Sequence, residues 1–419
     1  MSYLQFEKTI VKKRYLIILL AFFSCSTAKK INIEYSNTES ILEFQEFIED
    51  FEKDYIYLND KYELWNCIKN TYFKKVGSIK TESEHILFYE NLLNELYDNH
   101  IHLNTNISKS YRLNSPIYVT NKNGKTYIKN VWQTQLKEKL QTNIIGAEII
   151  SFNAIDFKNK IEGFPTICQD KSDYKVREWI ANKIIAGKRN ESRVLDLKLK
   201  NGELFTIDLD NLILRKETSA LSASIIPNHN IGLIRVNNTL GNDVLAKEFE
   251  RIMPQMDSTK ALVIDLRNTV DGGDTSVALP IMGIFINKKQ PYQLYENHKK
   301  KYLGYVKPNK LNYDKPLYLL VNRWTGSMGE GVAIGLNSMN RAKIIGTEME
   351  RLAGGMTTVN FKNHNYGASV SFERIFDVEG NPREEFVPEH YVEQTRTDKD
   401  EILEYTIEQI KTAGNTVYN

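Results

Sequence analysis

Cysteine is scarce in this chain, which has three cysteines among 419 residues. Cys25 lies near the N-terminus, so only Cys67 and Cys168 remain for the folded part, and a disulfide-rich scaffold is excluded. One bridge between these two would be allowed, but we expect two buried thiols. The seven histidines are scattered, and no Cys/His spacing is typical of a metal site, so we expect no metal.

An apolar run long enough to span a membrane is absent from the N-terminal segment. Residues 15–23 are nine apolar residues, whereas a spanning helix needs about 20. They follow Lys12-Lys13-Arg14 and precede Ser24-Cys25, an order typical of a signal peptide. We therefore predict export to the cell envelope, periplasm or outer membrane, with Cys25 as the acylated N-terminus of a lipoprotein. Ordinary signal cleavage and a retained anchor are the alternatives.

A strong charge imbalance and nucleotide-binding motifs are also lacking. Lys and Arg number 55 against 53 Asp and Glu, and no basic run follows the N-terminal segment, so we expect no nucleic-acid partner. Neither a phosphate-binding loop nor a dinucleotide fingerprint occurs, so we expect no cofactor. The remaining composition, 41% apolar and 26% charged, is that of a globular protein, and the length suggests two or three domains.

Three regions differ in their hydrophobic period. Apolar residues recur at spacings of three and four along residues 41–96, which predicts helices. Residues 114–211 contain short alternating strands and turns, interrupted by a helical stretch at 173–185. From residue 230 strands and helices alternate, as in an α/β core with mostly parallel strands. The predicted domains are a leader at 1–28, a helical domain at 29–112, a β-rich domain at 113–215 and an α/β core at 216–419.

The first loop that could carry chemistry contains a glycine pair. It follows the apolar strand at 261–266, and ligands in such folds collect at the carboxyl ends of strands. Gly272 and Gly273 would let the backbone approach a ligand, with amide hydrogens directed at an oxyanion. A plain strand-to-helix turn explains the pair equally simply.

The second loop contains Ser327, where the strand at 317–321 turns into a helix. The hydroxyl would meet the positive end of the helix dipole, with the amides of Met328 and Gly329 free to stabilise negative charge. The alternative is a capping box, in which Ser327 caps the helix and Glu330 reaches back.

Together the two loops resemble a known family. Asp265-Leu-Arg-Asn with Gly272-Gly273, followed by Thr325-Gly-Ser-Met-Gly-Glu330, resembles the C-terminal processing (tail-specific) serine peptidases and their tricorn-type relatives. The resemblance implies a crotonase-like or ClpP-like α/β core and a PDZ-like domain within 113–215 that binds extended peptide. It also implies Ser327 as the nucleophile and an oxyanion hole made by the amides of Gly272 or Gly273 and of Met328.

The serine also needs a base. The processing branch uses a lysine about 25 residues after the serine, but residues 346–356 contain none. The tricorn branch uses a histidine in a segment that Glu95-Leu-Tyr-Asp-Asn-His100 resembles, so His100 is the predicted general base and His102 the reserve. Surface or helix-end histidines are the alternative for both.

A carboxylate should orient the base. The resemblance points to Glu384 or Glu385, with Asp98 as a local alternative, although an acidic surface turn would explain the glutamates as well. The sequence as a whole predicts an exported serine hydrolase, a peptidase acting on peptide or protein substrates. The alternative is a catalytically inactive peptide- or ligand-binding protein on the same scaffold, because fold does not fix function.

Overall fold

The computed structural model describes residues 36–415. The described residues belong to one compact unit by their contacts. The predicted leader at 1–28, with Cys25, lies outside the described residues. Among those that are described, no helix is long and apolar enough to cross a membrane.

The helical region contains the helices expected from its period: α1 (Asn37–Asp54), α2 (Tyr62–Val76) and α3 (Glu82–Asn94). Ser36 caps α1 by accepting the Glu39 N–H, and Thr81 caps α3 by accepting the Glu84 N–H. Their apolar stripes, from Phe44 onward, pack into one aromatic-rich core. The prediction of helices is therefore confirmed.

Cys67 and Cys168 form a disulfide, so the expectation of two free thiols is wrong. The bridge joins α2 to the segment before α5 (Tyr174–Ala186), across 101 residues of sequence and a Cα–Cα distance of 5.8 Å. Sequence could not show this proximity, because it depends on how the helical and β-rich regions pack together.

The β-rich region forms an antiparallel sheet in the order β2-β3-β4-β6-β7, with β5 paired to β4. Its hydrophobic core is separate from that of the helices and includes the apolar face of α5. The predicted strands and the helix near 173–185 are confirmed, whereas α4 was not anticipated. The elements are β2 (Ile117–Lys122), β3 (Lys125–Val131), β4 (Glu148–Phe152), β5 (Ile155–Asp156), α4 (Phe157–Glu162), β6 (Val194–Lys198) and β7 (Leu204–Asp208).

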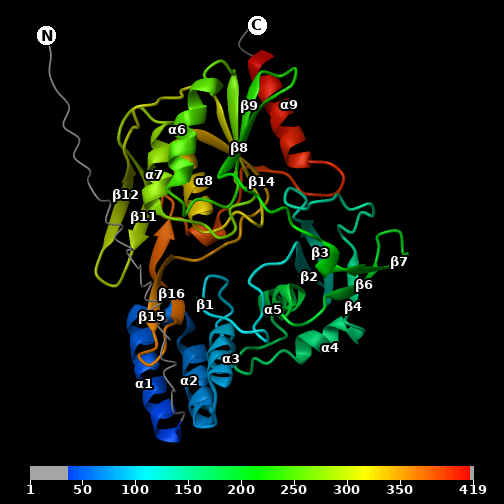
Figure 1. Cartoon of the computed structure of the whole chain (residues 1–419), viewed down its shortest axis with the longest axis vertical. Helices are drawn as coiled ribbons and strands as arrows, with labels where there is room; N and C mark the ends of the chain where they lie inside the picture. Colours follow the sequence, from blue (N-terminus) through cyan, green and yellow to red (C-terminus); the bar gives the residue numbers. More distant parts are fainter. Residues whose placement is uncertain (1–35, 416–419) are drawn as a thin grey trace, which may run out of the picture. The chain divides into compact units, whose positions relative to one another are not determined.

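The α/β core contains a second six-stranded sheet, in the order β17-β14-β13-β10-β9-β8. Its strands β8, β9 and β14 are labelled in Figure 1. All its pairings are parallel except that of β8 with β9, as the alternating pattern predicted. Helices α6, α7 and α8 share a hydrophobic core with one set of strand side chains, and α9 shares another with the opposite set. The elements are β8 (Leu221–Ile226), β9 (Ile231–Val236), α6 (Val244–Met256), β10 (Ala261–Asp265), α7 (Thr275–Gly283), β13 (Leu317–Val321), α8 (Met328–Ser338), β14 (Ala342–Gly346), β17 (His390–Tyr391) and α9 (Glu401–Asn415).

A third sheet, not predicted, joins the N-terminal and C-terminal halves of the described chain. Its order is β1-β16-β11-β12, and β15 also pairs with β16. Side chains from β15 and β16, such as Val359 and Val370, complete the core under the N-terminal helices. The elements are β1 (His102–Leu103), β11 (Gln290–Glu296), β12 (Lys301–Val306), β15 (Gly355–Asn360) and β16 (Gly367–Phe376).

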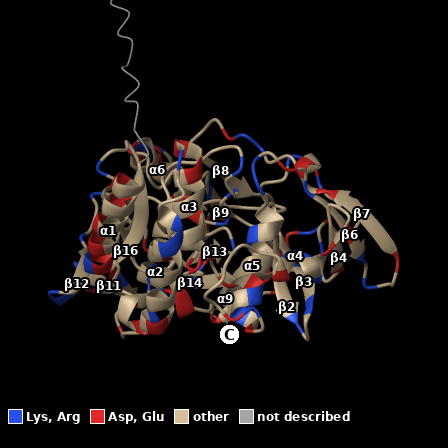
Figure 2. Ribbon diagram, turned by 90° about the horizontal axis from the view of Figure 1, so that it is seen from below, with Lys and Arg blue, Asp and Glu red and all other residues tan. Residues whose placement is uncertain are grey.

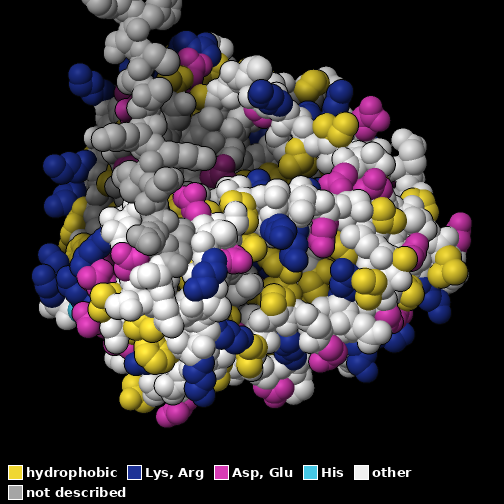
Figure 3. All heavy atoms as spheres, turned by 60° about the horizontal axis from the view of Figure 1, so that its bottom comes forward, with side chains coloured by type: hydrophobic (Ala, Val, Ile, Leu, Met, Phe, Trp, Pro, Cys, Tyr) yellow, Lys and Arg dark blue, Asp and Glu magenta, His cyan; other side chains and the backbone are white. Residues whose placement is uncertain are grey.

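Charges of both signs are dispersed over the ribbon, although acidic positions are frequent along α1 (Figure 2). On the face drawn in Figure 3, basic and acidic side chains alternate with hydrophobic ones. That face therefore carries no continuous field of one sign, as the near-neutral composition suggested.

Candidate active site

Ser327 stands at the turn between a fully buried strand, β13, and the first residue of α8. Its backbone has φ 47° and ψ −108°. A non-glycine residue in such a conformation costs about 1–3 kcal/mol, and such strain concentrates at functional sites. A strained strand-to-helix turn also projects a serine hydroxyl away from the sheet, as nucleophiles of other hydrolases require.

Glu330 holds this turn from the inside. Its carboxylate accepts the backbone N–H of Ser327 at 2.9 Å, and those of Arg351 and Leu352 at 2.9 and 3.2 Å. Burial raises the pKa of Glu330 to about 7. The expected capping box is thus present. It fixes the backbone of Ser327, and no described residue accepts a hydrogen bond from the serine hydroxyl, so capping and catalysis are compatible.

Gly272 lies directly against the serine. A Cβ added to it would fall 2.4 Å from Ser327 Cβ, 3.0 Å from Oγ and 3.1 Å from the Met328 nitrogen, and its φ is 64°. Only glycine fits there. The Gly272 N–H already donates to the Thr269 carbonyl oxygen at 3.0 Å, whereas no described acceptor engages the amide of Gly273. The Met328 amide is the first of α8 and has no partner within that helix.

Backbone contacts hold the two loops together. The Gly326 N–H donates to the Thr269 carbonyl oxygen at 3.2 Å, and Thr269 forms a parallel bridge with Thr325. A Cβ on Gly329 would lie 2.3 Å from Thr269 Oγ1. The predicted glycine loop and serine loop therefore meet at the carboxyl ends of β10 and β13, as the sheet rule requires.

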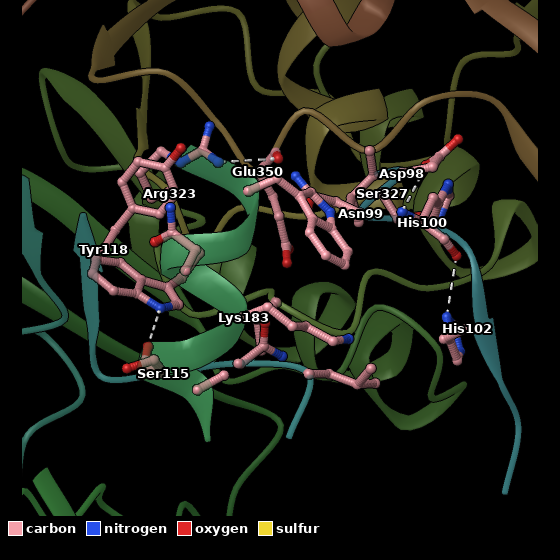
Figure 4. Close-up of a pocket in the computed structure, with 18 of the residues that line it drawn as sticks. Asp98, Asn99, His100, His102, Ser115, Tyr118, Lys183, Arg323, Ser327 and Glu350 are labelled. Carbon is pink, nitrogen blue, oxygen red and sulfur yellow. Dashed lines mark hydrogen bonds between the residues drawn. The ribbon is translucent and has the colours of Figure 1, made fainter. Parts of the chain in front are cut away.

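His100 and Ser327 line the same cavity of about 300 Å³ (Figure 4). His100 is only 7% exposed, and its Nδ1 lies 2.9 Å from the carbonyl oxygen of Ala353. A carbonyl only accepts, so Nδ1 carries the hydrogen and Nε2 keeps its lone pair. The backbone N–H of His100 donates to Asp98 Oδ1 at 2.9 Å. Burial, assisted by the nearby Arg383 charge, lowers the pKa of His100 to about 4, so the ring is neutral at pH 7.

Neither predicted glutamate contacts His100 among the described hydrogen bonds. Glu384 accepts from the Tyr57 hydroxyl at 3.3 Å instead, and burial raises its pKa. Glu385 ends the short 3-10 helix at Arg383–Glu385. The ring nitrogen that a triad carboxylate would hold is held here by the backbone carbonyl of Ala353.

His102, the reserve base, begins β1 and lines the same cavity. Its Nδ1 lies 3.1 Å from the carbonyl oxygen of His100, and burial lowers its pKa. Both predicted histidines therefore line the cavity. His100 differs from His102 in the hydrogen bond between its Nδ1 and the carbonyl oxygen of Ala353.

The charged or aromatic residues at the cavity that were not predicted include Tyr118, Lys183, Arg323 and Glu350. Burial lowers the pKa of Lys183 and raises that of Glu350. The Arg323 guanidinium lies over the Tyr118 ring, 4.0 Å from its centre. Arg323 is next to the serine motif and could have been noted, whereas no sequence pattern marks Tyr118 or Lys183, which come from the β-rich region.

Part of the chain, including both loops, matches a family model. Residues 230–392 match the model of peptidase family S41. The matched S41 domain contains the strands β9 to β14, both loops and Ser327. The matched range begins at residue 230 and therefore does not include His100. No curated protein matches the chain in sequence.

Several solved structures share the fold over most of the chain. The photosystem II D1 C-terminal processing protease is 16% identical, with 84% of this chain and 93% of that one covered and a TM-score of 0.55. Mature CPAF complexed with lactacystin is 12% identical, with coverage of 91% and 98% and a TM-score of 0.60. A lipoprotein from Streptococcus agalactiae is 11% identical, with coverage of 89% and 96% and a TM-score of 0.50. These similarities show that residues 230–392 and the regions before them share the fold of these solved structures, one of which is a processing protease.

Proposed function

We propose that this chain is a serine peptidase that cleaves peptide or protein substrates through an acyl-enzyme on Ser327, with His100 as general base. One observation carries the proposal: a strained serine packed on a glycine backbone shares a cavity with a buried, neutral histidine. The match of residues 230–392 to peptidase family S41 supports it independently.

The proposed reaction uses these residues in turn. His100 Nε2 takes the proton of the Ser327 hydroxyl as Oγ attacks the carbonyl carbon of the substrate. The amides of Met328 and Gly273 stabilise the oxyanion, since that of Gly272 is committed to Thr269. The imidazolium then protonates the leaving amine, and a water, activated by the same ring, hydrolyses the acyl-enzyme.

The base is oriented differently from a Ser-His-carboxylate triad. The Ala353 carbonyl fixes the tautomer of His100, but a neutral carbonyl stabilises an imidazolium less than a carboxylate does. Ser371 Oγ donates to the same carbonyl at 2.8 Å. Glu384 and Glu385 as orienting carboxylates therefore stay a prediction that would require rearrangement of this segment.

A lysine base is the competing mechanism, and Lys183 is its candidate. It lines the same cavity, and burial lowers its pKa, which favours the neutral amine that a base requires. Its Nζ lies 5.6 Å from the centre of the Trp179 ring, a contact that favours the charged form instead. We therefore assign the base to His100.

We further propose that the protein is exported and that its β-rich region is a PDZ-like peptide-binding domain. The disulfide Cys67–Cys168 supports export, because such bonds persist in oxidising compartments. Acylation of Cys25 would anchor the chain to a membrane. The edge strands of the sheet containing β2 and β7 could accept an extended peptide as an added strand.

The direct test of a peptidase is the appearance of new peptide termini. Purified wild-type protein and Ser327→Ala are incubated with a mixture of unfolded proteins, and new N-termini are identified by mass spectrometry. We expect new termini with the wild type and with the control Ser338→Ala, at the other end of α8, but none with Ser327→Ala. Equal cleavage by Ser327→Ala would overturn the assignment.

Two further variants separate the bases. His100→Ala should abolish cleavage, and Lys183→Met, which keeps the length and apolar stem of the side chain, should retain it. The reverse pattern would move the base to Lys183 while keeping Ser327 as the nucleophile. If wild-type protein cleaves nothing and binds peptides without turnover, the carrier function replaces the peptidase.

A further inference from the structure

Three side chains with metal-binding atoms converge in the helical region, outside the cavity of Ser327. Glu43 comes from α1, His85 from α3 and His364 from the turn between β15 and β16. One ligand atom from each lies within 4.8 Å of the others. Glu43 Oε2 is 2.9 Å from His85 Nε2 and 3.6 Å from His364 Nε2. Side-chain exposure is 10% for Glu43 and 1% for each histidine.

A second observation points toward a ligand. The other carboxylate oxygen of Glu43, Oε1, is buried with no hydrogen-bond partner among the described residues. A buried carboxylate oxygen without a partner is costly, and bound ions are among the groups that satisfy such atoms. The pair formed by Glu43 and His85 therefore does not by itself satisfy the carboxylate.

The orientation of His85 also suits a metal ligand. The Tyr366 hydroxyl lies 2.9 Å from His85 Nδ1 and can accept its hydrogen. In the tautomer with the hydrogen on Nδ1, Nε2 directs its lone pair toward Glu43 and can bind an ion; in the other tautomer, Nε2–H donates to Glu43 Oε2. Histidines that bind metals commonly donate their other N–H to such a partner, which fixes the tautomer.

The ligand set and its surroundings select the class of ion. Two imidazoles and one carboxylate are ligands that zinc accepts at about 2.0–2.2 Å, which places tetrahedral ligands about 3.4 Å apart. The observed separations of 2.9 and 3.6 Å differ from that value by a few tenths of an ångström. Aromatic rings of Tyr89, Phe361 and Tyr366 pack against the histidines.

We propose that Glu43, His85 and His364 form a binding site for a divalent cation of the zinc class. The ion would cross-link α1, α3 and the β15–β16 turn, which are distant in sequence and share one hydrophobic core. Because α3 leads into the segment that carries His100, the site would stabilise the scaffold behind the cavity. It takes no part in the proposed acyl transfer, so the two proposals can fail separately.

The test measures zinc binding by the full chain after chelator treatment. Titration with Zn²⁺ in a calorimeter, and metal analysis after desalting, should give one ion per chain. Glu43→Gln and His364→Ala should each weaken binding by more than about 100-fold, since even loss of an outer-shell partner costs 10–100-fold. Two control variants remove other side chains that could bind zinc: His298→Ala removes an exposed histidine, and Cys25→Ser removes a thiol. Both variants should bind zinc as the wild type does.

Co²⁺ provides a readout that does not depend on stability. Wild-type protein should show the visible absorption of a tetrahedral cobalt site, with changes in His364→Gln, a variant of similar size. Each variant is first shown to retain the far-ultraviolet circular dichroism of the wild type. If folded wild type binds no zinc, or if folded Glu43 and His364 variants bind it as tightly, the proposal is wrong and the cluster is a set of interacting side chains without an ion.

Discussion

Replacing Gly272 by alanine should inactivate the protein while leaving it folded. The added Cβ would fall 2.4 Å from Ser327 Cβ. Carbon atoms in contact sit about 3.5–4.0 Å apart, so the serine or the glycine loop must move by about 1 Å. A misplacement of about 1 Å at a reacting group can cost about 100-fold in rate.

A second loss adds to the first. The same Cβ would lie 3.1 Å from the Met328 nitrogen, whose amide is a proposed oxyanion donor. Removing one such donor costs about 100- to 1,000-fold in kcat in other serine hydrolases. We therefore expect Gly272→Ala to react at least about 100-fold more slowly with a fluorophosphonate, whose second-order labelling rate needs no known substrate.

Backbone strain must be separated from contact with the serine. Alanine in a left-handed conformation costs about 1–2 kcal/mol wherever it occurs. Gly124 is the matched control, because its φ is 75° and no atom lies within 4 Å of an added Cβ. Gly124→Ala should lose similar stability but label at the wild-type rate. If Gly272→Ala also labels at the wild-type rate, the packing of the glycine loop on Ser327 has no catalytic role.

Four further predictions follow from particular residues. The pKa of His100 is lowered to about 4, so kcat/KM should stay flat from pH 8 down to about 5 and fall near 4; an acid limb at the ordinary value of 6.5 would contradict His100 as the base. Because the folded pKa lies below the unfolded one, the stability contributed by neutral His100 is also lost as pH falls from 6.5 toward 4, which urea titrations at each pH would detect. Arg383 donates hydrogen bonds to the carbonyl oxygens of Leu352 and Gly354, which flank Ala353. Arg383→Met should therefore lower kcat, and it should lower the free energy of unfolding by about 1–3 kcal/mol for each carbonyl left without its partner. Unchanged kinetics would contradict this positioning role. Cys168→Ala removes the disulfide that closes a 101-residue loop, so it should lower the free energy of unfolding, measured by chemical denaturation, by about 2–5 kcal/mol. If a reductant changes the stability of wild type and variant equally, no disulfide forms.

The sequence predicted elements wherever the hydrophobic period was local. The helices α1 to α3 and the buried strands β10 and β13 lie where their patterns placed them, because each buries its own apolar face. The loops at Gly272 and Ser327 meet because parallel strands bring their carboxyl ends to one edge.

Features that depend on packing between distant segments were missed. In the third sheet, the two-residue strand β1 pairs with β16, which lies more than 260 residues later in the sequence. The contact from His100 to the carbonyl of Ala353 involves backbone, which carries no residue-type signal. The expectation of no metal rested on spacing along the chain and stays a prediction, but that spacing could not show that the fold brings Glu43, His85 and His364 together.

The most direct measurement of the central claim is the site of fluorophosphonate attachment. Full-length protein is treated with the probe between pH of about 5 and 9, a range that spans titration of histidine and of a burial-shifted lysine, and the adduct is mapped by peptide mass spectrometry. We predict a single adduct on Ser327, absent from Ser327→Ala and His100→Ala and present in His102→Ala. Attachment to another residue, or no attachment at any pH in folded protein, would contradict a peptidase with Ser327 as its nucleophile.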